Sequence, residues 1–150
     1  MHGSRLTWAS LILACMGTIV AAYLVIIHYR EHALVCGIGN CEKVQTSSYA
    51  ELAGVPIAWL GLAMYLVILG LTILREARPT TGEVVTVALF GLTLAGTLYV
   101  AYLTYLEIWV IEAICQWCVA FAIITVLMFV GSTIRLARLF IHNDSEPSRP

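Results

Sequence analysis

Glu112-Ala-Ile-Cys115-Gln-Trp-Cys118-Val-Ala-Phe121 joins a C-x-x-C pair to an apolar run that continues to Leu136. The run is long enough to predict a membrane-spanning helix. Residues three apart in a helix share one face, so the two sulfurs are expected to lie one above the other. A thiol near the N-terminus of a helix also experiences the positive end of the helix dipole, which favours the thiolate. The stretch therefore predicts a reactive dithiol at the end of a membrane helix.

Composition places the chain among polytopic membrane proteins. Of its 150 residues, 61% are hydrophobic and 11% are charged, whereas soluble domains have about 25% charged residues. The formal net charge is −1 and the sequence has no basic patch, so nothing predicts an interaction with nucleic acid. The first apolar run is too long for a signal peptide and no small-residue cleavage site follows it, so we interpret it as a spanning helix.

Four apolar runs predict four membrane-spanning helices, because each is long enough to cross a hydrocarbon core of about 30 Å. The expected spans cover about residues 6–29, 56–74, 84–106 and 114–136. We therefore expect an all-α integral membrane protein, with a four-helix transmembrane bundle over residues 1–140. The polar residues 141–150 are expected to be a disordered tail.

The one long polar loop, residues 30–54, is expected to cap the bundle. Apolar side chains within it and just after it recur at intervals typical of one helix face, and they are Val44, Tyr49, Leu52 and Val55. Such a face predicts a short helix lying at the membrane surface.

Basic residues predict the orientation of the bundle. The two termini and the 75–83 turn hold six of the eight basic residues, namely Arg5, Arg75, Arg78, Arg135, Arg138 and Arg149. The opposite side holds only Arg30 and Lys43. The positive-inside rule therefore predicts that both termini are cytoplasmic. Both cysteine pairs then lie on the outer side of the membrane, where thiols are oxidised.

Four of the five cysteines form two close pairs of different design. Cys36 and Cys41 lie in the polar loop, where two glycines give the backbone freedom to move, whereas Cys115 and Cys118 open a helix that is expected to be rigid. A mobile pair beside a fixed pair suits a relay in which thiolates attack disulfides. Two alternatives remain, namely permanent structural cross-links and a zinc site of four cysteines.

Electrons taken from thiols on the outer side need an acceptor. No pair of histidines suited to haem lies within a span, and the sequence has no glycine-rich dinucleotide motif. The economical acceptor is a lipid-soluble quinone that enters from the bilayer beside Cys118. Trp117, Phe121 and Trp59 are candidate walls of this quinone site, although aromatic residues near an interface also serve simply as anchors.

Other polar and reactive residues are expected to have structural roles. Cys15 lies within the first span, where a free cysteine usually behaves as a small buried hydrophobe. Glu107 and Glu112 are expected to be solvated charges at the membrane interface. A stripe on the third span is expected to pack or anchor that helix, and it comprises Tyr99, Tyr102 and Tyr105.

The chain resembles the vitamin K epoxide reductase family, and in particular its stand-alone bacterial members. The residues that carry the resemblance are, in chain order, Cys36, Cys41-Glu-Lys-Val-Gln-Thr-Ser47-Ser48, Gly54-Val-Pro-Ile-Ala-Trp-Leu-Gly61 and Cys115-Gln-Trp-Cys118. This order of motifs covers about residues 7–136. The resemblance implies a four-helix bundle that surrounds a quinone such as menaquinone or ubiquinone. It also implies that this bundle lies in a bacterial inner membrane.

The resemblance also implies a role for each matching cysteine. Cys36 and Cys41 would exchange with a separate thioredoxin-like thiol protein. Cys41 would then pass electrons to Cys115, and Cys118 would be the thiol that faces the quinone. Ser47 matches the family serine that supports the cap and the active site.

Two positions depart from the vertebrate members of the family. Those enzymes carry an Asn and a Tyr near the substrate ketones, where this sequence has Ile57 and Ala122, which argues against epoxide reduction. We therefore expect a membrane thiol–quinone oxidoreductase that drives disulfide formation outside the cytoplasm, without a metal site. A rival family of four-helix quinone-linked thiol oxidases performs the same net reaction. It places its C-x-x-C near the second helix and its mobile pair later, and this order is reversed in the present chain. The alternative is a non-catalytic membrane protein whose cysteines form structural disulfides or bind a metal.

Overall fold

The computed structural model describes residues 2–30, 35–52, 54–77 and 82–144. Four long helices dominate it: α1 (His2–Tyr29), α3 (Ile57–Ala77), α4 (Gly82–Trp109) and α5 (Gln116–Asp144). Each contains a stretch long and apolar enough to cross a membrane. The four predicted spanning helices are therefore confirmed, and the chain is a multi-pass membrane protein.

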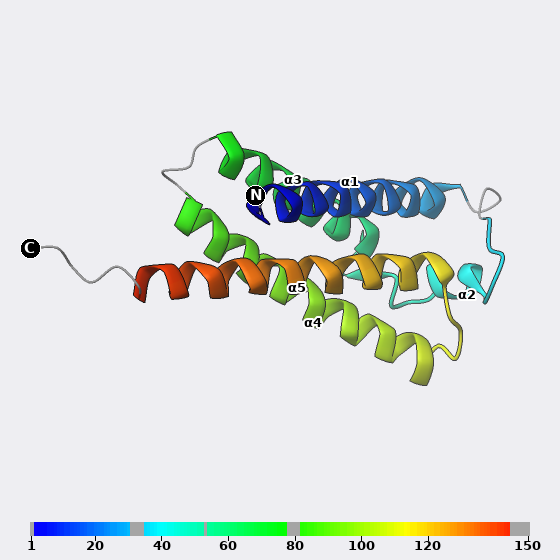
Figure 1. Ribbon diagram of the computed structural model, residues 1–150. Helices are drawn as coiled ribbons and strands as arrows, with labels where there is room; N and C mark the ends of the chain where they lie inside the picture. Colours follow the sequence, from blue (N-terminus) through cyan, green and yellow to red (C-terminus); the bar gives the residue numbers. More distant parts are fainter. Residues whose placement is uncertain (1, 31–34, 53, 78–81, 145–150) are drawn as a thin grey trace, which may run out of the picture.

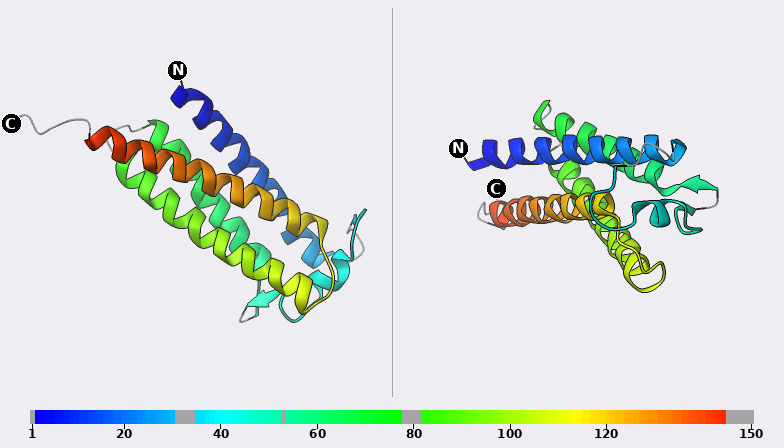
Figure 2. Two further views of the ribbon diagram at one scale, coloured as in Figure 1. Left: turned by 60° about the horizontal axis from the view of Figure 1, so that its bottom comes forward. Right: turned by 90° about the vertical axis from the view of Figure 1, so that its right-hand side faces the viewer.

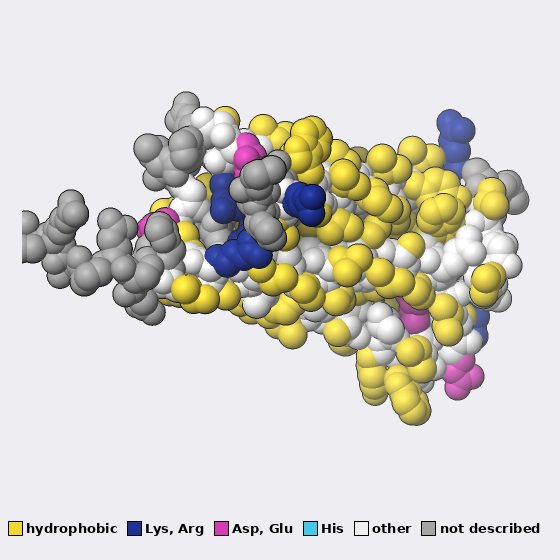
Figure 3. Space-filling view, in the orientation of Figure 1, with side chains coloured by type: hydrophobic (Ala, Val, Ile, Leu, Met, Phe, Trp, Pro, Cys, Tyr) yellow, Lys and Arg dark blue, Asp and Glu magenta, His cyan; other side chains and the backbone are white. Residues whose placement is uncertain are grey.

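The four helices form a bundle in which neighbours in the sequence pack together. The most extensive contacts join α1 to α3 and α4 to α5, and further contacts join α1 to α5 and α3 to α4. The start of α1 and the end of α5 lie at one end of the bundle, and the connection that carries α2 (Cys41–Gln45) lies at the other (Figures 1 and 2). A hydrophobic flank separates these two ends, and Lys and Arg side chains gather near the termini (Figure 3).

The centre of the bundle is apolar and closely packed. Its buried cluster draws on all four helices and comprises Ala14, Tyr65, Ile68, Val85, Leu89, Ile124 and Met128. Gly17 in α1 makes room for the Tyr65 ring of α3, since a Cβ atom at this position would overlap the ring. Small residues at such crossings let membrane helices approach closely, and the close packing strengthens the dispersion attraction between them.

Polar side chains inside the bundle bond mainly to the backbone of their own helix. Thr72 donates to the carbonyl of Ile68, and Thr125 donates to the carbonyl of Phe121. Two pairs of hydroxyl groups also reach between helices: the hydroxyls of Tyr65 and Thr125 lie 3.1 Å apart, and those of Thr93 and Ser132 lie 2.7 Å apart. Internal partners are required because lipid offers none to a hydroxyl group.

The helices extend beyond the spans read from hydropathy. The first begins at His2, the second continues to Ala77, and α4 ends at Trp109. The last helix runs to Asp144, so the expectation of a disordered tail was wrong for residues 141–144, while 145–150 lie outside the described residues. Hydropathy detects only the part of a helix that lies in the bilayer, and the polar turns beyond it give no such signal.

The cap at the far end corrects one prediction. The cap contains a short helix, as expected, but its extent over Val44, Tyr49, Leu52 and Val55 was wrong. Only Val44 lies in α2, which ends at Gln45, and a small antiparallel hairpin follows, with strands β1 (Glu51–Leu52) and β2 (Val55–Pro56). Side-chain hydroxyls end the helix: Thr46 donates to the carbonyl of Glu42, and Ser47 donates to the carbonyl of Val44. Such local bonds compete with helix propagation.

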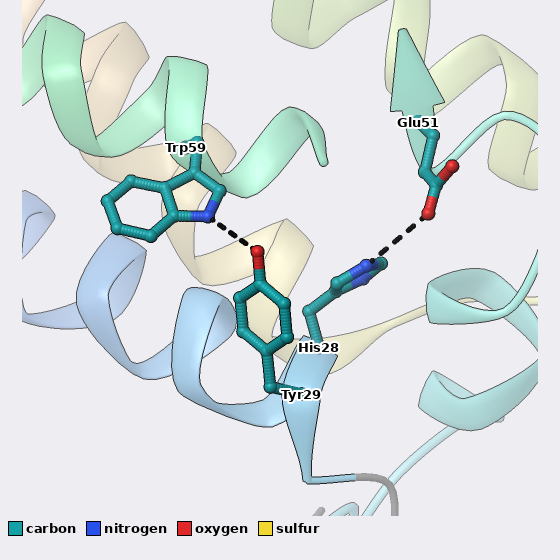
Figure 4. Close-up of polar contacts among 4 residues, drawn as sticks. All are labelled: His28, Tyr29, Glu51 and Trp59. Carbon is teal, nitrogen blue, oxygen red and sulfur yellow. Dashed lines mark hydrogen bonds and ion pairs between the residues drawn. The ribbon is translucent and has the colours of Figure 1, made fainter. Parts of the chain in front are cut away.

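Two polar contacts tie this end of the bundle together (Figure 4). His28, near the end of α1, lies 3.5 Å from the carboxylate of Glu51 in the hairpin. The adjacent Tyr29 accepts a 3.2 Å hydrogen bond from the indole of Trp59 in α3. The first contact holds the hairpin against α1, and the second joins the capped ends of α1 and α3.

Candidate redox site

The two cysteine pairs come together at the capped end of the bundle. Cys41 and Cys115 belong to one buried cluster, both with none of their surface exposed, and Cys36 and Cys118 pack against it. Cys36 and Cys41 are joined by a disulfide, whereas Cys115 and Cys118 are free thiols. The loop pair is thus oxidised and the C-x-x-C pair is reduced, with one buried sulfur of each pair facing the same cluster.

Backbone contacts hold the cysteine loop against the start of α5. The N–H of Asn40 donates to the carbonyl of Ile114 at 3.0 Å, and Gly39 pairs with Cys115 as in an antiparallel sheet. Gly39 has a φ of +89°, and a Cβ atom there would collide with the carbonyl oxygen of Ile114. Both facts require glycine at this position. Asn40 also caps α2, since its side chain accepts from the N–H of Lys43.

The two residues between the C-x-x-C cysteines bind the loop on either side of Cys36. The side-chain oxygen of Gln116 accepts hydrogen bonds from the N–H groups of Gly37 and Ile38, at 3.2 and 3.0 Å. The carbonyl of Val35 accepts from the Gln116 amide at 3.3 Å and from the Trp117 indole at 2.9 Å. We call these two side chains the latch.

Cys115 occupies the position just before α5, in surroundings that favour its thiolate. A hydrogen bond from the Cys118 thiol is the largest factor that lowers the pKa of Cys115, to about 7. The backbone N–H groups of Cys118 and Trp117 lower this pKa further, while burial and the charge of Glu107 oppose the change. The thiolate is the reactive form in disulfide exchange. A favoured thiolate is what the sequence predicted for a thiol at a helix N-terminus.

Glu107 corrects a further expectation, because it is not a solvated charge. It lies in the last turns of α4 and only 6% of its surface is exposed. Its carboxylate accepts a 3.2 Å hydrogen bond from the N–H of Cys115 and also interacts with the thiol of Cys118. The turn after α4 brings it there: Glu112 adopts a positive φ of 52°, which reverses the chain toward α5. Glu112 itself is exposed, as expected.

An apolar cavity of about 390 Å³ opens beside Cys118. Its lining comes from α1, α3, α4, α5 and the cap, and is mostly aliphatic. The polar or ionisable members of the lining are few: His28, Gln45, Ser47, Tyr49, Tyr99, Thr104, Glu107 and Cys118. This volume lies within the range of about 300–1,000 Å³ that is typical of small-molecule sites.

The structure separates the predicted aromatic residues. Phe121 lines the cavity and packs edge-on against Tyr65, with ring centroids 5.1 Å apart. Trp117 instead packs against Tyr23 with the two rings tilted and their centroids 4.6 Å apart, and it belongs to the latch. Trp59 is 44% exposed, bonds to the hydroxyl of Tyr29, and is not among the cavity's lining residues.

Ser47 lies in the cavity wall and at the same time makes a local bond. Its hydroxyl donates to the carbonyl of Val44 at 2.8 Å, so it holds the end of α2 beside the cavity. Ile57 also lines the cavity, at one of the positions where vertebrate relatives carry a polar residue.

Sequence reasoning missed several residues around the C-x-x-C. Tyr99 and His28 line the cavity together with Glu107, whereas Tyr102 and Tyr105 of the same stripe are more than half exposed. Only the eight-residue spacing of Glu107 from Cys115 was available as a signal, and it has meaning only once the turn is known. Cys15, expected to be buried, is exposed on the bundle surface.

This arrangement allows a defined chemistry. A buried disulfide sulfur lies beside a thiolate that is itself paired with a second thiol, and that second thiol opens into an apolar cavity. Thiol–disulfide exchange can therefore move electron pairs between the loop and the C-x-x-C. From there they can pass to an apolar acceptor in the cavity.

A comparison with known protein families places the site in context. The sequence profile of the vitamin K epoxide reductase family matches residues 8–133, which is most of the chain and includes all of the cysteines.

Proposed function

Because this chain belongs to the vitamin K epoxide reductase family and is a membrane oxidoreductase, we propose that it is a thiol–quinone oxidoreductase. It takes electrons from a separate thioredoxin-like protein through Cys36 and Cys41. It passes them by way of Cys115 and Cys118 to a quinone such as menaquinone or ubiquinone. The net result is disulfide formation outside the cytoplasm.

One observation carries this proposal, which is the double placement of Cys118. Its thiol hydrogen-bonds to Cys115, next to the loop disulfide, and it also forms part of the cavity wall. A structural cross-link has no need of a free thiol that opens into a cavity. A redox relay needs one, because the electrons must leave the second pair for an acceptor.

The cavity fits a quinone in size and in chemistry. Its wall is mostly aliphatic, as suits a prenylated ring, and Phe121 offers an aromatic edge. Few hydroxyl, imidazole and carboxyl groups reach the lining, and a small number of polar groups is what orients a ligand in an apolar pocket. When bound, the quinone supplies a two-electron, two-proton acceptor.

The proposed exchange balances in electrons and sulfur bonds. The partner's dithiol reduces the Cys36–Cys41 disulfide and becomes a disulfide itself. Cys41 then attacks a Cys115–Cys118 disulfide at Cys115, which forms a mixed bond and releases Cys118 as a thiolate. Cys36 attacks Cys41, restores the loop disulfide and releases Cys115 as a thiolate. The reduced C-x-x-C pair finally gives up two electrons and closes its own disulfide.

Exposed apolar residues support a protein partner at Cys36. Val35 and Ile38 flank this cysteine and are 71% and 78% exposed. The loop lies at the end of the bundle opposite the termini (Figure 1). A partner that presents a reactive cysteine beside an apolar surface would bury both side chains while it exchanged with Cys36.

We place the protein in the bacterial inner membrane with both termini cytoplasmic and the cysteine pairs outside. The basic side chains near the termini support this orientation (Figure 3). Labelling of intact cells with a membrane-impermeant thiol reagent tests it after reduction of the loop disulfide. Cys36 should be labelled without permeabilisation, and protection of Cys36 until the cells are opened would reverse the orientation.

Quinone reduction by the purified protein in detergent, with a small dithiol as donor, tests the function. We expect turnover in the wild type, loss of turnover in Cys118→Ala, and wild-type turnover in the matched control Cys15→Ala, whose cysteine lies on the bundle surface. No turnover in the wild type with several quinones, together with bound zinc, would instead support the structural alternative.

A further inference from the structure

We propose that Glu107 is a catalytic proton donor, which supplies the second of the two protons that a quinone takes up when the C-x-x-C pair reduces it. This inference rests on the proposed function, since it concerns the acceptor side of the same site. It assigns a role to a residue that neither the cysteine motifs nor the aromatic residues indicate.

Burial of the Glu107 carboxyl group costs free energy, and a catalytic role accounts for its position. A carboxylate buried near a membrane core loses its hydration, and this loss is tolerated only with compensating partners. The partners here are both parts of the redox pair, namely the N–H of Cys115 at 3.2 Å and the thiol of Cys118. No Lys or Arg belongs to the described lining of the cavity, so no permanently charged cation in that wall offsets the charge of the carboxyl.

Glu107 also reaches the place where protons are needed. It is the only carboxyl group among the described residues that line the cavity, where the other titratable side chains are His28, Tyr49, Tyr99 and Cys118. Its interaction with Cys118 joins the carboxyl to the thiol that opens into the cavity. The aliphatic lining leaves few other donors for an acceptor within it.

Proton counting shows why a second donor is needed. Because the pKa of Cys115 is lowered to about 7, the reduced pair holds one thiolate and one thiol under mildly alkaline conditions. It therefore supplies two electrons but only one proton, from Cys118. A protonated Glu107 supplies the other. Reactants are the Cys115 thiolate, the Cys118 thiol, the Glu107 acid and quinone, and products are the disulfide, the Glu107 carboxylate and hydroquinone.

The charge of the site stays constant through this step. Before it, the negative charge is on the Cys115 sulfur, and after it the charge is on Glu107, where the hydrogen bond from the Cys115 N–H stabilises it. Two negative charges side by side in a buried site are strongly disfavoured, so Glu107 is protonated when Cys115 is a thiolate. When the pair forms its uncharged disulfide, the carboxylate form is favoured.

Redox titration of the quinone-free protein in detergent tests this coupling without turnover. Above the pKa of Cys115, reduction of the wild-type C-x-x-C pair should take up about two protons, one on Cys118 and one on Glu107. In Glu107→Gln it should take up about one, so the slope of the pair's midpoint potential against pH should halve. The matched control Glu112→Gln alters an exposed carboxyl close by and should keep the wild-type slope.

Quinone reduction provides the kinetic counterpart. General acid catalysis contributes about 10²-fold or more, so Glu107→Gln should lose about that much turnover at neutral pH. The loss should grow as the pH rises, because the missing proton must then come from solvent. A role of Glu107 in folding alone would produce a loss that does not vary with pH.

Two results would overturn the inference. One is a wild-type slope in Glu107→Gln together with turnover within about threefold of the wild type. The other needs no variant: the infrared difference spectrum of the quinone-free wild type should gain a protonated-carboxyl band on reduction, and its absence would contradict the proposal. Because slope and spectrum are measured without quinone, a failure of Glu107 to couple to the pair is distinct from a failure of the protein to reduce quinone.

Discussion

At the residue scale, the site depends on how neighbouring groups lower the pKa of one thiol. Cys115 is fully buried, yet its pKa is lowered to about 7 because the Cys118 thiol and two backbone N–H groups donate to its sulfur. Its thiolate is therefore present above about pH 7 and is lost as the pH falls below that value. Electron transfer through this sulfur should become slower in acid for the same reason.

Removing the Cys118 thiol should reverse this tuning. In Cys118→Ala we expect the pKa of Cys115 to rise from about 7 toward its ordinary value of 9.0, because the largest stabilising hydrogen bond is gone. Cys118→Ser, whose hydroxyl still donates, should give an intermediate value. Ultraviolet absorbance of the thiolate, followed against pH, measures the change. An unchanged titration midpoint of Cys115 in Cys118→Ala would mean that another group lowers its pKa.

Single residues differ in how well the sequence predicted them. The cysteines were predictable because the chemistry of a C-x-x-C is local. The positions of Glu107 and Cys15 were not, because burial depends on which face of a helix meets its neighbours. Glu107 meets Cys115 only through the turn at Glu112, and no periodicity in the sequence encodes that turn.

At the element scale, the start of α5 does two things at once. It presents the C-x-x-C pair, and its latch residues, Gln116 and Trp117, bind the backbone of the cysteine loop. Since these contacts are to backbone groups, they fix the position of the loop without restricting its side chains. The loop disulfide is held beside Cys115 as a consequence.

Breaking the latch should slow the relay but leave the acceptor side intact. Gln116→Met removes three hydrogen bonds, each worth about 1 kcal/mol, so transfer from the loop pair to the C-x-x-C should slow by about tenfold to 100-fold. Quench-labelling of thiols after rapid reduction of the loop measures this rate. Quinone reduction by a C-x-x-C pair that has been fully reduced beforehand should be unaffected.

Gln116→Glu is the matched variant, since it keeps the oxygen that accepts from Gly37 and Ile38 but loses the donor to Val35. Its transfer rate should lie between those of the wild type and Gln116→Met. Equal rates in all three proteins would show that the latch does not position the loop.

Elements in the membrane were predictable and those of the cap were not. Four helices follow from hydropathy because a chain in lipid must satisfy its backbone internally. In the cap, apolar residues at helical intervals suggested a helix as far as Val55. The hydroxyls of Thr46 and Ser47 end the helix instead, and Leu52 and Val55 pair as strand neighbours.

At the scale of the whole molecule, the bundle combines a packed core with a cavity at one end. The core cluster around Tyr65 lies in the middle of the helices, and the cavity lies between this cluster and the cap. Close approach of α1 and α3 at Gly17 keeps the core tight. The cap and the C-x-x-C can then be placed accurately on a rigid base.

The close approach at Gly17 gives a stability prediction. Gly17→Ala should destabilise the protein by about 1–3 kcal/mol, because the added methyl group overlaps the Tyr65 ring and the helices must separate. Gly70→Ala is the control, since a Cβ atom there meets nothing within 4 Å, and it should be neutral or slightly stabilising. Thermal unfolding in detergent compares the two, and equal melting temperatures would contradict this view of the core.

The central claim is that two cysteine pairs and one cavity form a single electron path. Anaerobic single-turnover reduction of excess quinone by fully reduced protein tests it most directly. Each dithiol carries two electrons, so the wild type and Cys15→Ala should each form two hydroquinones per chain. A Cys36→Ala, Cys41→Ala double variant should form one, and Cys118→Ala should form none. Full yield from Cys118→Ala, or a single hydroquinone from the wild type, would show that the pairs do not act in series.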